Sequence, residues 1–287
     1  MNILVTGDKG FVAKNLIPQL KKKRHRIIIL EKKINKKVEI SLKNKKIDVL
    51  IHCAGIAHTK VSKNTIYFNN YNVTKILIES IDKSYLKKII FLSTSKINQI
   101  KYYKNKKLLK NYKDYYCESK IKAENFIKDY CQINNIKYSI IRPTLIYGKG
   151  VKGNLYRLAK IIKRGYPLPL KAFDTNKSYL SIKNLSTFIL KLLTDKKTNN
   201  QTFLISDNEP ISLNILISKL YNINNFKNRN FYLPKFLINF LLYLMGKREL
   251  IISLNNDFIV QNNELIKKIK WTPKNFSNQD LKNIYYE

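Results

Sequence analysis

Short apolar runs alternate with stretches of helical spacing through the first half of the chain. The apolar runs cover residues 2–6, 26–30, 49–53, 89–92 and 138–141, and helical spacing covers residues 11–22 and 115–131. The apolar runs lack period-two alternation, so each strand is expected to be buried on both faces. The pattern therefore predicts an α/β fold in which helices cover a doubly wound parallel sheet.

A glycine-containing turn separates the first apolar run from the first helical stretch. Residues 6–13 read TGDKGFVA, in which Gly7 permits a tight turn and Gly10 lets the backbone approach a pyrophosphate. Ala13 stands where a third glycine often occurs. The helix that follows would present free N–H groups and the positive end of its dipole to the anion. The turn predicts a Rossmann-type site for a dinucleotide.

Glu31 ends the second apolar run, 24 residues after Gly7. A carboxylate at this place accepts a hydrogen bond from the adenosine ribose and repels a 2′-phosphate, which favours NAD. Lys32 and Lys33 follow immediately and would hold a 2′-phosphate instead. We expect NAD as the cofactor, with NADP as the alternative.

The chain of 287 residues has 55 basic and 19 acidic residues, a formal net charge of +36. Such an excess is typical of proteins that bind nucleic acid or an anionic surface. The lysines are spread through the whole chain, however, and accompany an excess of Asn, Ile and Tyr, the set that AT-rich codons favour. We therefore predict no nucleic-acid partner, and we expect the lysine-rich residues 101–113 to form a surface loop.

The three cysteines, Cys53, Cys117 and Cys131, form no C-x-x-C pair. Unclustered thiols in odd number indicate a reducing, cytoplasmic location and no zinc or other metal site. The first residues already read as a strand and turn, so we expect no signal peptide. The longest apolar run, residues 236–245, is too short to span a bilayer and predicts a helix packed against the protein, with contact to lipid as the alternative.

Tyr116 and Lys120 stand four residues apart, which places both side chains on one face of a helix. A lysine beside a phenol lowers the pKa of the phenol and prepares it to exchange protons. The same spacing occurs seven times in this chain, so spacing alone does not identify a catalytic pair. Tyr116 and Lys120 differ from the other six pairs because they open a long helical stretch that follows the Ser/Thr-rich strand end at residues 93–95.

Several motifs resemble those of the extended short-chain dehydrogenase/reductases, in particular the nucleotide-sugar epimerase/dehydratase family. Besides the glycine turn, they are HCAG at residues 52–55, the helix that begins at Asn70, FLSTSKIN at 91–98, YCESKIKAE at 116–124 and RPTLIYG at 142–148. The resemblance implies that Thr94 orients the sugar hydroxyl and that Tyr116 exchanges its proton. It also implies that Lys120 lowers the pKa of the tyrosine and holds the nicotinamide ribose.

The same resemblance assigns cofactor contacts to positions in the first half of the chain. These are Gly7, Gly10, Phe11, Val12, Glu31, Ala54, Gly55, Asn70, Tyr116, Lys120 and Pro143. The implied organisation is an NAD-binding domain over residues 1–150 and a smaller, mainly substrate-binding region over residues 151–287, from which segments return to the first domain. A homodimer is also implied.

The second half of the chain is similar to one subgroup, the enzymes that act on UDP-hexoses and N-acetylated UDP-sugars. Residues 150–154, GVKGN, end in Asn154, which implies a contact with the nucleotide diphosphate. Lys177 replaces a phosphate-binding arginine, so it keeps the charge and loses the two-pronged geometry. Arg248 would bind diphosphate or serve only as a helix-end charge. Together with Thr94, these three residues are the expected substrate contacts.

The reaction that the resemblance implies is oxidoreduction at C4 of a UDP-sugar. In a 4-epimerase the ketosugar turns over and is reduced on its other face; in the alternative, a UDP-4-keto-6-deoxy-HexNAc is reduced once with NAD(P)H. The 4,6-dehydratases of the family carry Asp-Glu after the catalytic Thr, where this chain has Ser95 and Lys96, so we expect no dehydratase chemistry. A non-catalytic nucleotide sensor of the same fold is a further alternative, but such proteins usually lose the Tyr or the Lys.

Overall fold

The computed structural model describes residues 1–30, 42, 45–56, 61–105 and 113–285. They form two compact units. The first unit comprises Met1–Pro143, Leu185–Ile205 and Asn263–Trp271, and the second comprises Thr144–Asn184, Ser206–Asn262 and Thr272–Glu287. Two segments from the second half of the chain thus belong to the first unit. The assignment of cofactor binding to one unit and substrate binding to the other stays a prediction.

A six-stranded parallel sheet forms the centre of the first unit, with the order β2-β1-β3-β4-β5-β9. Its strands are β1 (Asn2–Thr6), β2 (Arg26–Ile29), β3 (Val49–His52), β4 (Lys88–Leu92), β5 (Lys137–Pro143) and β9 (Gln201–Ile205). The strand order reverses beside β1, and ligands of doubly wound sheets bind at the carboxyl ends of the strands at such a point. The predicted α/β fold is confirmed.

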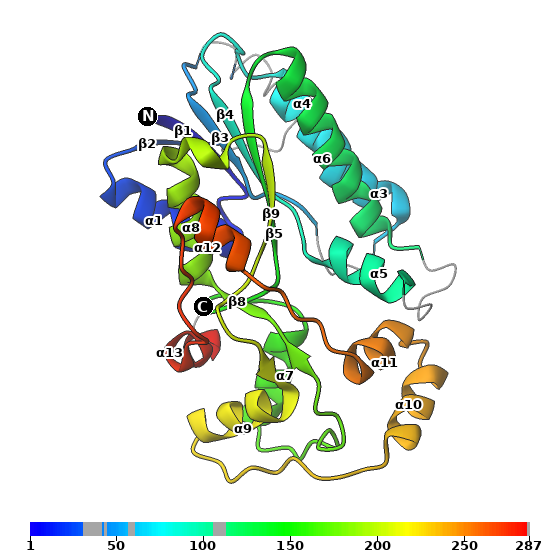
Figure 1. Cartoon of the computed structure of the whole chain (residues 1–287). Helices are drawn as coiled ribbons and strands as arrows, with labels where there is room; N and C mark the ends of the chain where they lie inside the picture. Colours follow the sequence, from blue (N-terminus) through cyan, green and yellow to red (C-terminus); the bar gives the residue numbers. More distant parts are fainter. Residues whose placement is uncertain (31–41, 43–44, 57–60, 106–112, 286–287) are drawn as a thin grey trace. The chain divides into compact units, whose positions relative to one another are not determined.

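Helices cover both faces of this sheet (Figure 1). On one face lie α3 (Lys63–Tyr67), α4 (Val73–Glu79) and α6 (Tyr115–Ile133), and on the other lie α1 (Phe11–Lys22), α8 (Ile182–Thr194) and α12 (Asn263–Ile269). Apolar residues of the sheet, α4 and α6 form a continuous core that includes Leu4, Leu50, Leu77, Ala123 and Ile127. Burial on both faces explains why successive strand positions are apolar.

The prediction of a surface loop over residues 101–113 is wrong for residues 101–105. These residues continue the helix α5 (Lys96–Asn105). Tyr103 is buried and accepts a hydrogen bond from Gln99, one turn earlier (Nε2 to Oη 3.2 Å). The buried Tyr103 side chain anchors this segment, although the composition of the segment predicts a solvated loop. Residues 106–112 lie outside the described residues.

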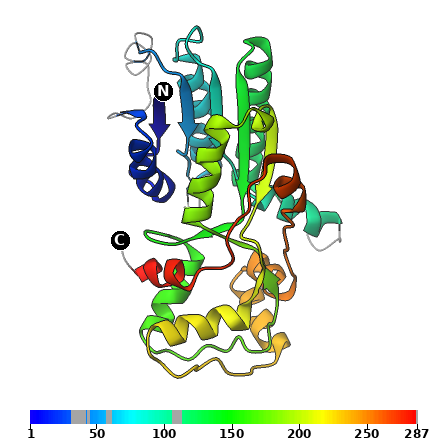
Figure 2. The ribbon, with the colours of Figure 1, turned by 60° about the vertical axis from the view of Figure 1, so that its left-hand side comes forward.

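Two short β ladders and several helices build the second unit. β6 (Leu145–Tyr147) pairs in parallel with β8 (Tyr179–Ser181), and β7 (Asn176–Lys177) pairs antiparallel with β10 (Ile211–Ser212). The helices α7 (Asn154–Lys163) and α9 (Leu213–Ile223) lie side by side (Figure 2). The other helices of this unit are α10 (Lys235–Leu244), α11 (Arg248–Asn255), α13 (Asn278–Lys282) and the short η3 (Asn283–Tyr285).

Tyr147 organises the interior of the second unit. Its hydroxyl donates to Asp207 (Oη to Oδ2 2.7 Å) and accepts a hydrogen bond from the backbone N–H of Ser277 (2.7 Å). Asp207 also accepts hydrogen bonds from the backbone of Ser181 and the side chain of Asn184. The tyrosine of the RPTLIYG motif is therefore a structural residue that joins distant segments of this unit.

The helix α10 differs from the prediction of a packed helix. Within α10, all of which the structure describes, only Ile238 is buried. Its apolar residues fill more than one face, so the neighbouring helix α11 covers only part of them. Among the described residues, none of the helices combines the length and the apolar character needed to cross a bilayer.

Candidate active site

The glycine turn joins the carboxyl end of β1 to the first turn of α1. Gly7 has a φ of +74°, which residues with side chains rarely adopt, and a Cβ there would lie 2.9 Å from the backbone nitrogen of Ala54. A Cβ on Gly10 would lie 2.9 Å from the carbonyl oxygen of Gly7, which accepts a hydrogen bond from the Gly10 N–H. The turn thus requires both glycines, and it brings the chain after β1 against the chain after β3.

Gly55 follows β3 and lies beside two residues that are distant from it in the sequence. A Cβ on Gly55 would lie 2.9 Å from Nζ of Lys120 and 3.2 Å from Oδ1 of Asn70. Glycine therefore leaves room for both side chains at this point. The structure brings together three residues predicted to contact the cofactor, and it does so at the carboxyl edge of the sheet.

Asn70 is buried in η1 (Phe68–Asn72), a π-helical turn that links α3 to α4. Its side chain accepts a hydrogen bond from the N–H of Ile56 (2.8 Å) and donates to the carbonyl of Ile56 (3.1 Å) and to Oγ of Ser119 (3.1 Å). Ser119 in turn donates to the carbonyl of Tyr116 (2.8 Å). Asn70 thereby fixes the loop after β3 to the first turns of α6, and its contact with the cofactor stays a prediction.

His52 ends β3 and lies buried between two threonines. Its Nδ1 lies 2.6 Å from Oγ1 of Thr6, and its Nε2 lies 2.8 Å from Oγ1 of Thr74. Thr74 donates its own proton to the carbonyl of Asn70, so it accepts from Nε2–H, and Nδ1 accepts from Thr6. Burial, assisted by the charge of Lys120, lowers the pKa of His52 to about 3. His52 is therefore neutral and joins β1, β3 and α4.

Thr94 and Tyr116, two of the residues predicted to be catalytic, contact each other. Thr94 follows β4, Tyr116 is the second residue of α6, and the Thr94 side chain lies near enough to the phenol to lower its pKa. Burial raises the pKa of Tyr116 to about 12, whereas the nearby Thr94 hydroxyl and the charge of Lys96 lower it. In the protein alone the phenol is thus protonated at neutral pH.

An ion pair that the sequence analysis missed lies beside Tyr116. Nζ of Lys96 lies 2.5 Å from Oδ2 of Asp114, and Asp114 caps α6 by accepting a hydrogen bond from the N–H of Cys117 (2.9 Å). The backbone N–H of Lys96 donates to Oγ1 of Thr94 (3.2 Å). The pair therefore holds the strand end that carries Thr94 against the first turn of α6. An Asp directly before a helical stretch is the sequence signal that would have found this cap.

Lys120 is buried, and its ammonium group donates to the carbonyl of Leu92 at the end of β4 (3.0 Å). Burial lowers the pKa of Lys120 to about 8. The prediction that Tyr116 has a lowered pKa is wrong for the protein alone, because burial of the phenol outweighs the charges near it. The cation that does lower the pKa of Tyr116 is Lys96.

A buried ion pair joins two residues to which the sequence analysis gave no role. The carboxylate of Glu124 in α6 accepts hydrogen bonds from Nε (2.9 Å) and Nη2 (2.5 Å) of Arg142 in β5, and from the hydroxyl of Ser93. Arg142 also donates to Oδ1 of Asn98 (3.1 Å). The same carboxylate therefore fixes α6 to β5 and holds the residue next to Thr94.

The carboxyl edge of the sheet fits a dinucleotide. Three glycines keep it free of side chains, and Gly10 precedes α1 without a side-chain cap, which leaves N–H groups for a pyrophosphate. Phe11 and Val12 open α1, and Pro143 ends β5; their contacts with the cofactor stay predictions. Glu31 lies outside the described residues. Among the described residues, no group of three or more His, Cys, Asp or Glu side chains could hold a metal ion.

Two of the predicted substrate contacts lie exposed at the starts of helices in the second unit. Asn154 is the first residue of α7 and follows Gly153, which has a φ of +87°. Arg248 is the first residue of α11, and its guanidinium lies 5.5 Å from the centroid of the Tyr243 ring. Their contact with a diphosphate stays a prediction.

Lys177, the third predicted substrate contact in this unit, already has partners. Its ammonium group donates to the carbonyls of Ser253 (2.6 Å) and Asn256 (2.7 Å) at the end of α11. Burial lowers the pKa of Lys177 to about 8. Lys177 therefore holds the helix that carries Arg248, and a direct contact of Lys177 with phosphate stays a prediction.

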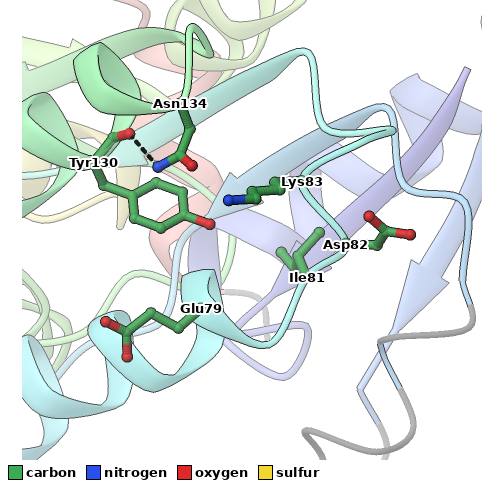
Figure 3. Close-up of a pocket in the computed structure, with 6 residues that line it drawn as sticks. All are labelled: Glu79, Ile81, Asp82, Lys83, Tyr130 and Asn134. Carbon is green, nitrogen blue, oxygen red and sulfur yellow. Dashed lines mark hydrogen bonds between the residues drawn. The ribbon is translucent and has the colours of Figure 1, made fainter.

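A cavity of about 460 Å³ elsewhere in the first unit is separate from this site (Figure 3). It is lined by Glu79, Ile81, Asp82, Lys83, Tyr130 and Asn134. These residues precede β4 and β5, so the cavity lies at the amino ends of the strands. Ligands of doubly wound sheets bind at the opposite edge.

Comparisons with known proteins agree with the geometry of the site. The profile of the NAD dependent epimerase/dehydratase family matches residues 3–206. The UDP-glucose 4-epimerase of Vibrio cholerae is 28% identical over 302 aligned residues, which cover 95% of this chain and 90% of that protein. The GDP-6-deoxy-D-talose 4-dehydrogenase of Aggregatibacter actinomycetemcomitans is 27% identical over 219 residues, which cover 70% of this chain and 73% of that protein.

The fold is also similar to solved structures. The crystal structure of UDP-glucuronic acid 4-epimerase from Bacillus cereus in complex with NAD has a TM-score of 0.77 and 20% identity, and the match covers 99% of this chain and 97% of that chain. The segment that matches the family profile contains the glycine turn, Thr94, Tyr116 and Lys120. The chain therefore belongs to the NAD-dependent epimerase/dehydratase family, enzymes of the extended short-chain dehydrogenase/reductase type whose cofactor is NAD.

Proposed function

We propose that the protein is an NAD-dependent 4-epimerase of a UDP-sugar. The observation that carries the proposal is the grouping of Thr94, Tyr116 and Lys120 at the carboxyl edge of the sheet that holds the glycine turn. The UDP-glucose 4-epimerase of Vibrio cholerae, which aligns with 95% of the chain, supports C4 of a UDP-sugar as the reacting centre.

In the proposed reaction Tyr116 takes the proton of the C4 hydroxyl while Thr94 orients that hydroxyl. The glycine turn and Lys120 would hold NAD, which would supply reversible hydride transfer at C4. Tyr116 then gives its proton back to the C4 oxygen. The raised pKa of the buried phenol opposes the first transfer, so the nearby cation of Lys96, which lowers this pKa, is needed to stabilise the phenolate.

A second candidate function is the single reduction of a 4-keto-6-deoxy sugar nucleotide with NAD(P)H. The GDP-6-deoxy-D-talose 4-dehydrogenase to which the chain is similar supports this reaction class. A buried phenol with a raised pKa suits the direction in which Tyr116 only donates a proton to the C4 oxygen. Under both proposals Asn154 and Arg248 contact the diphosphate, and the enzyme acts as a cytoplasmic homodimer.

Incubation of the purified protein with three sugar nucleotides distinguishes these functions. The substrates are UDP-glucose, UDP-GlcNAc and a UDP-4-keto-6-deoxy-HexNAc, each with and without NADH or NADPH. A 4-epimerase converts one of the first two into its C4 epimer, seen by NMR, with no net oxidation of cofactor. A reductase consumes reduced cofactor in equal amount with the ketosugar. A protein that binds NAD but converts none of these substrates would contradict both proposals.

A further inference from the structure

The helix α10 carries a stripe of large apolar side chains that neighbouring residues leave exposed. Phe236, Phe240 and Leu244 follow one another at four-residue spacing and are 69%, 59% and 66% exposed. Leu237 and Leu241 widen the stripe. An exposed apolar patch of this kind marks a site of contact with a protein or a membrane.

The stripe belongs to a helix with a fixed C-terminal end and a fixed inner face. Ile238 is buried, and Asn239 on the same side accepts a hydrogen bond from Asn255 of the adjacent helix α11 (3.0 Å; Figure 1). Gly246, with a φ of +66°, ends the helix, and the N–H of Lys247 bonds to the carbonyl of Leu242 (2.8 Å). The exposed side chains are therefore held on one surface.

The chain on both sides of α10 carries only positive charge as far as Arg248, after which the exposed Glu249 follows. The exposed basic residues are Lys227, Arg229, Lys235, Lys247 and Arg248. The sequence has no acidic residue between Glu209 and Glu249. An apolar helix bordered by cations complements a surface that combines acyl chains with negative phosphates.

The same charges argue against a second copy of this chain as the partner of α10. A two-fold contact pairs a surface with itself, so the basic residues of one copy would face those of the other. The segment between Glu209 and Glu249 supplies no carboxylate to neutralise them.

We propose that α10 docks the protein on a membrane that contains anionic phospholipid. The apolar stripe enters the headgroup region while the flanking Lys235 and Lys247 side chains contact lipid phosphates. The helix has 10 residues and lies in the interface without crossing the bilayer. The proposal does not depend on the reaction assigned to the active site.

Sedimentation with vesicles tests the docking. The natural protein is mixed with vesicles of phosphatidylcholine alone, or of phosphatidylcholine with one third phosphatidylglycerol, and compared with Phe236→Ser/Phe240→Ser. This variant keeps every charge and alters only exposed positions, so we expect it to fold, which circular dichroism checks. The expected result is binding of the natural protein to the anionic vesicles and at least about tenfold weaker binding of the variant, through loss of buried apolar surface.

Two further variants separate docking through α10 from general attraction of a basic protein. Ile133→Ser/Ile215→Ser changes two exposed aliphatic residues outside α10 and should bind like the natural protein. Lys235→Gln/Lys247→Gln should bind the anionic vesicles more weakly. Equal binding of the natural protein and Phe236→Ser/Phe240→Ser would overturn the proposal. A second result would also overturn it: the natural protein binds neither kind of vesicle but forms a dimer, detected by light scattering, and Phe236→Ser/Phe240→Ser dissociates that dimer.

Discussion

At the scale of single residues, burial decides the role of His52. Both ring nitrogens contact threonine hydroxyls, and burial lowers the pKa of His52 to about 3 from an unfolded value of 6.5. The unfolded chain therefore binds a proton more readily than the folded protein between these two values. The stability that neutral His52 contributes is fully present above pH 6.5 and is lost as the pH falls toward 3.

We expect the free energy of unfolding to decrease on acidification below the unfolded pKa of His52, by up to about 1.4 kcal/mol per pH unit. His52→Gln should lower stability at neutral pH and flatten this slope, because the titrating group is gone. His25→Gln is the control, since His25 is much less buried than His52. Urea denaturation over a pH series measures the slope, and an unchanged slope in His52→Gln would contradict the assignment.

At the scale of elements, α6 connects the chemistry to the fold. Asp114 caps its N-terminus, Tyr116 and Lys120 occupy its first turns, and Glu124 fixes it to β5 through Arg142. The Glu124 carboxylate is 1% exposed, so loss of its partner leaves a buried charge without compensation.

We predict that Arg142→Met destabilises the protein by about 3–5 kcal/mol, the cost of breaking a buried ion pair from one side. Glu124→Leu/Arg142→Met should recover most of this loss, because both charges are then removed. Lys75→Met breaks the exposed pair Lys75–Glu79 and should cost less than about 0.5 kcal/mol. Guanidinium denaturation measures all three, and a similar loss for Arg142→Met and the double variant would contradict the account.

The same scale shows why two elements could not be predicted from the sequence. The composition of α5 is that of a solvated loop, and its helix depends on the burial of Tyr103, a contact that no local pattern reveals. The apolar run of α10 predicts a packed helix by the rule that apolar residues are buried. The structure exposes most of α10, because α11 covers too little of it.

At the scale of the whole molecule, the active site does not explain the net charge of +36. The basic residues at predicted site positions are few, namely Lys120, Lys177 and Arg248. Lys120 and Lys177 are engaged with backbone carbonyls. The remaining positive charge is distributed over the chain, so a groove for nucleic acid is not expected.

We therefore expect duplex DNA to bind weakly at physiological salt, in the non-specific range of about 10⁻⁴–10⁻⁶ M. Fluorescence anisotropy with labelled duplex measures this affinity. Lys101→Gln/Lys104→Gln, in the lysine-rich segment, should change it little. Sub-micromolar binding that this variant abolishes would restore nucleic acid as a partner.

Features of the fold that local patterns determine could be predicted from the sequence, and side-chain contacts that depend on the folded structure could not. The parallel sheet and the glycine turn were predictable because strand burial and motif spacing are local signals. The roles of Thr94 and Tyr116 rest on the family resemblance and stay predictions. The Lys96–Asp114 pair and the partners of Lys177 were not predictable, because each joins side chains of separate elements whose packing the sequence pattern does not specify. The net effect of burial on the pKa of Tyr116 likewise requires the folded environment.

The central claim is that Tyr116 exchanges the proton at C4 of the sugar nucleotide, and Tyr116→Phe tests it most directly. The matched control is Tyr71→Phe, because Tyr71 and Lys75 have the same four-residue spacing. Turnover is measured by NMR on the sugar nucleotide that the natural protein converts, and NAD affinity by calorimetry. We predict at least about a hundredfold loss of turnover for Tyr116→Phe, the low end for a lost general acid and base, with NAD affinity little changed and Tyr71→Phe near normal. Near-normal turnover by Tyr116→Phe would contradict the account.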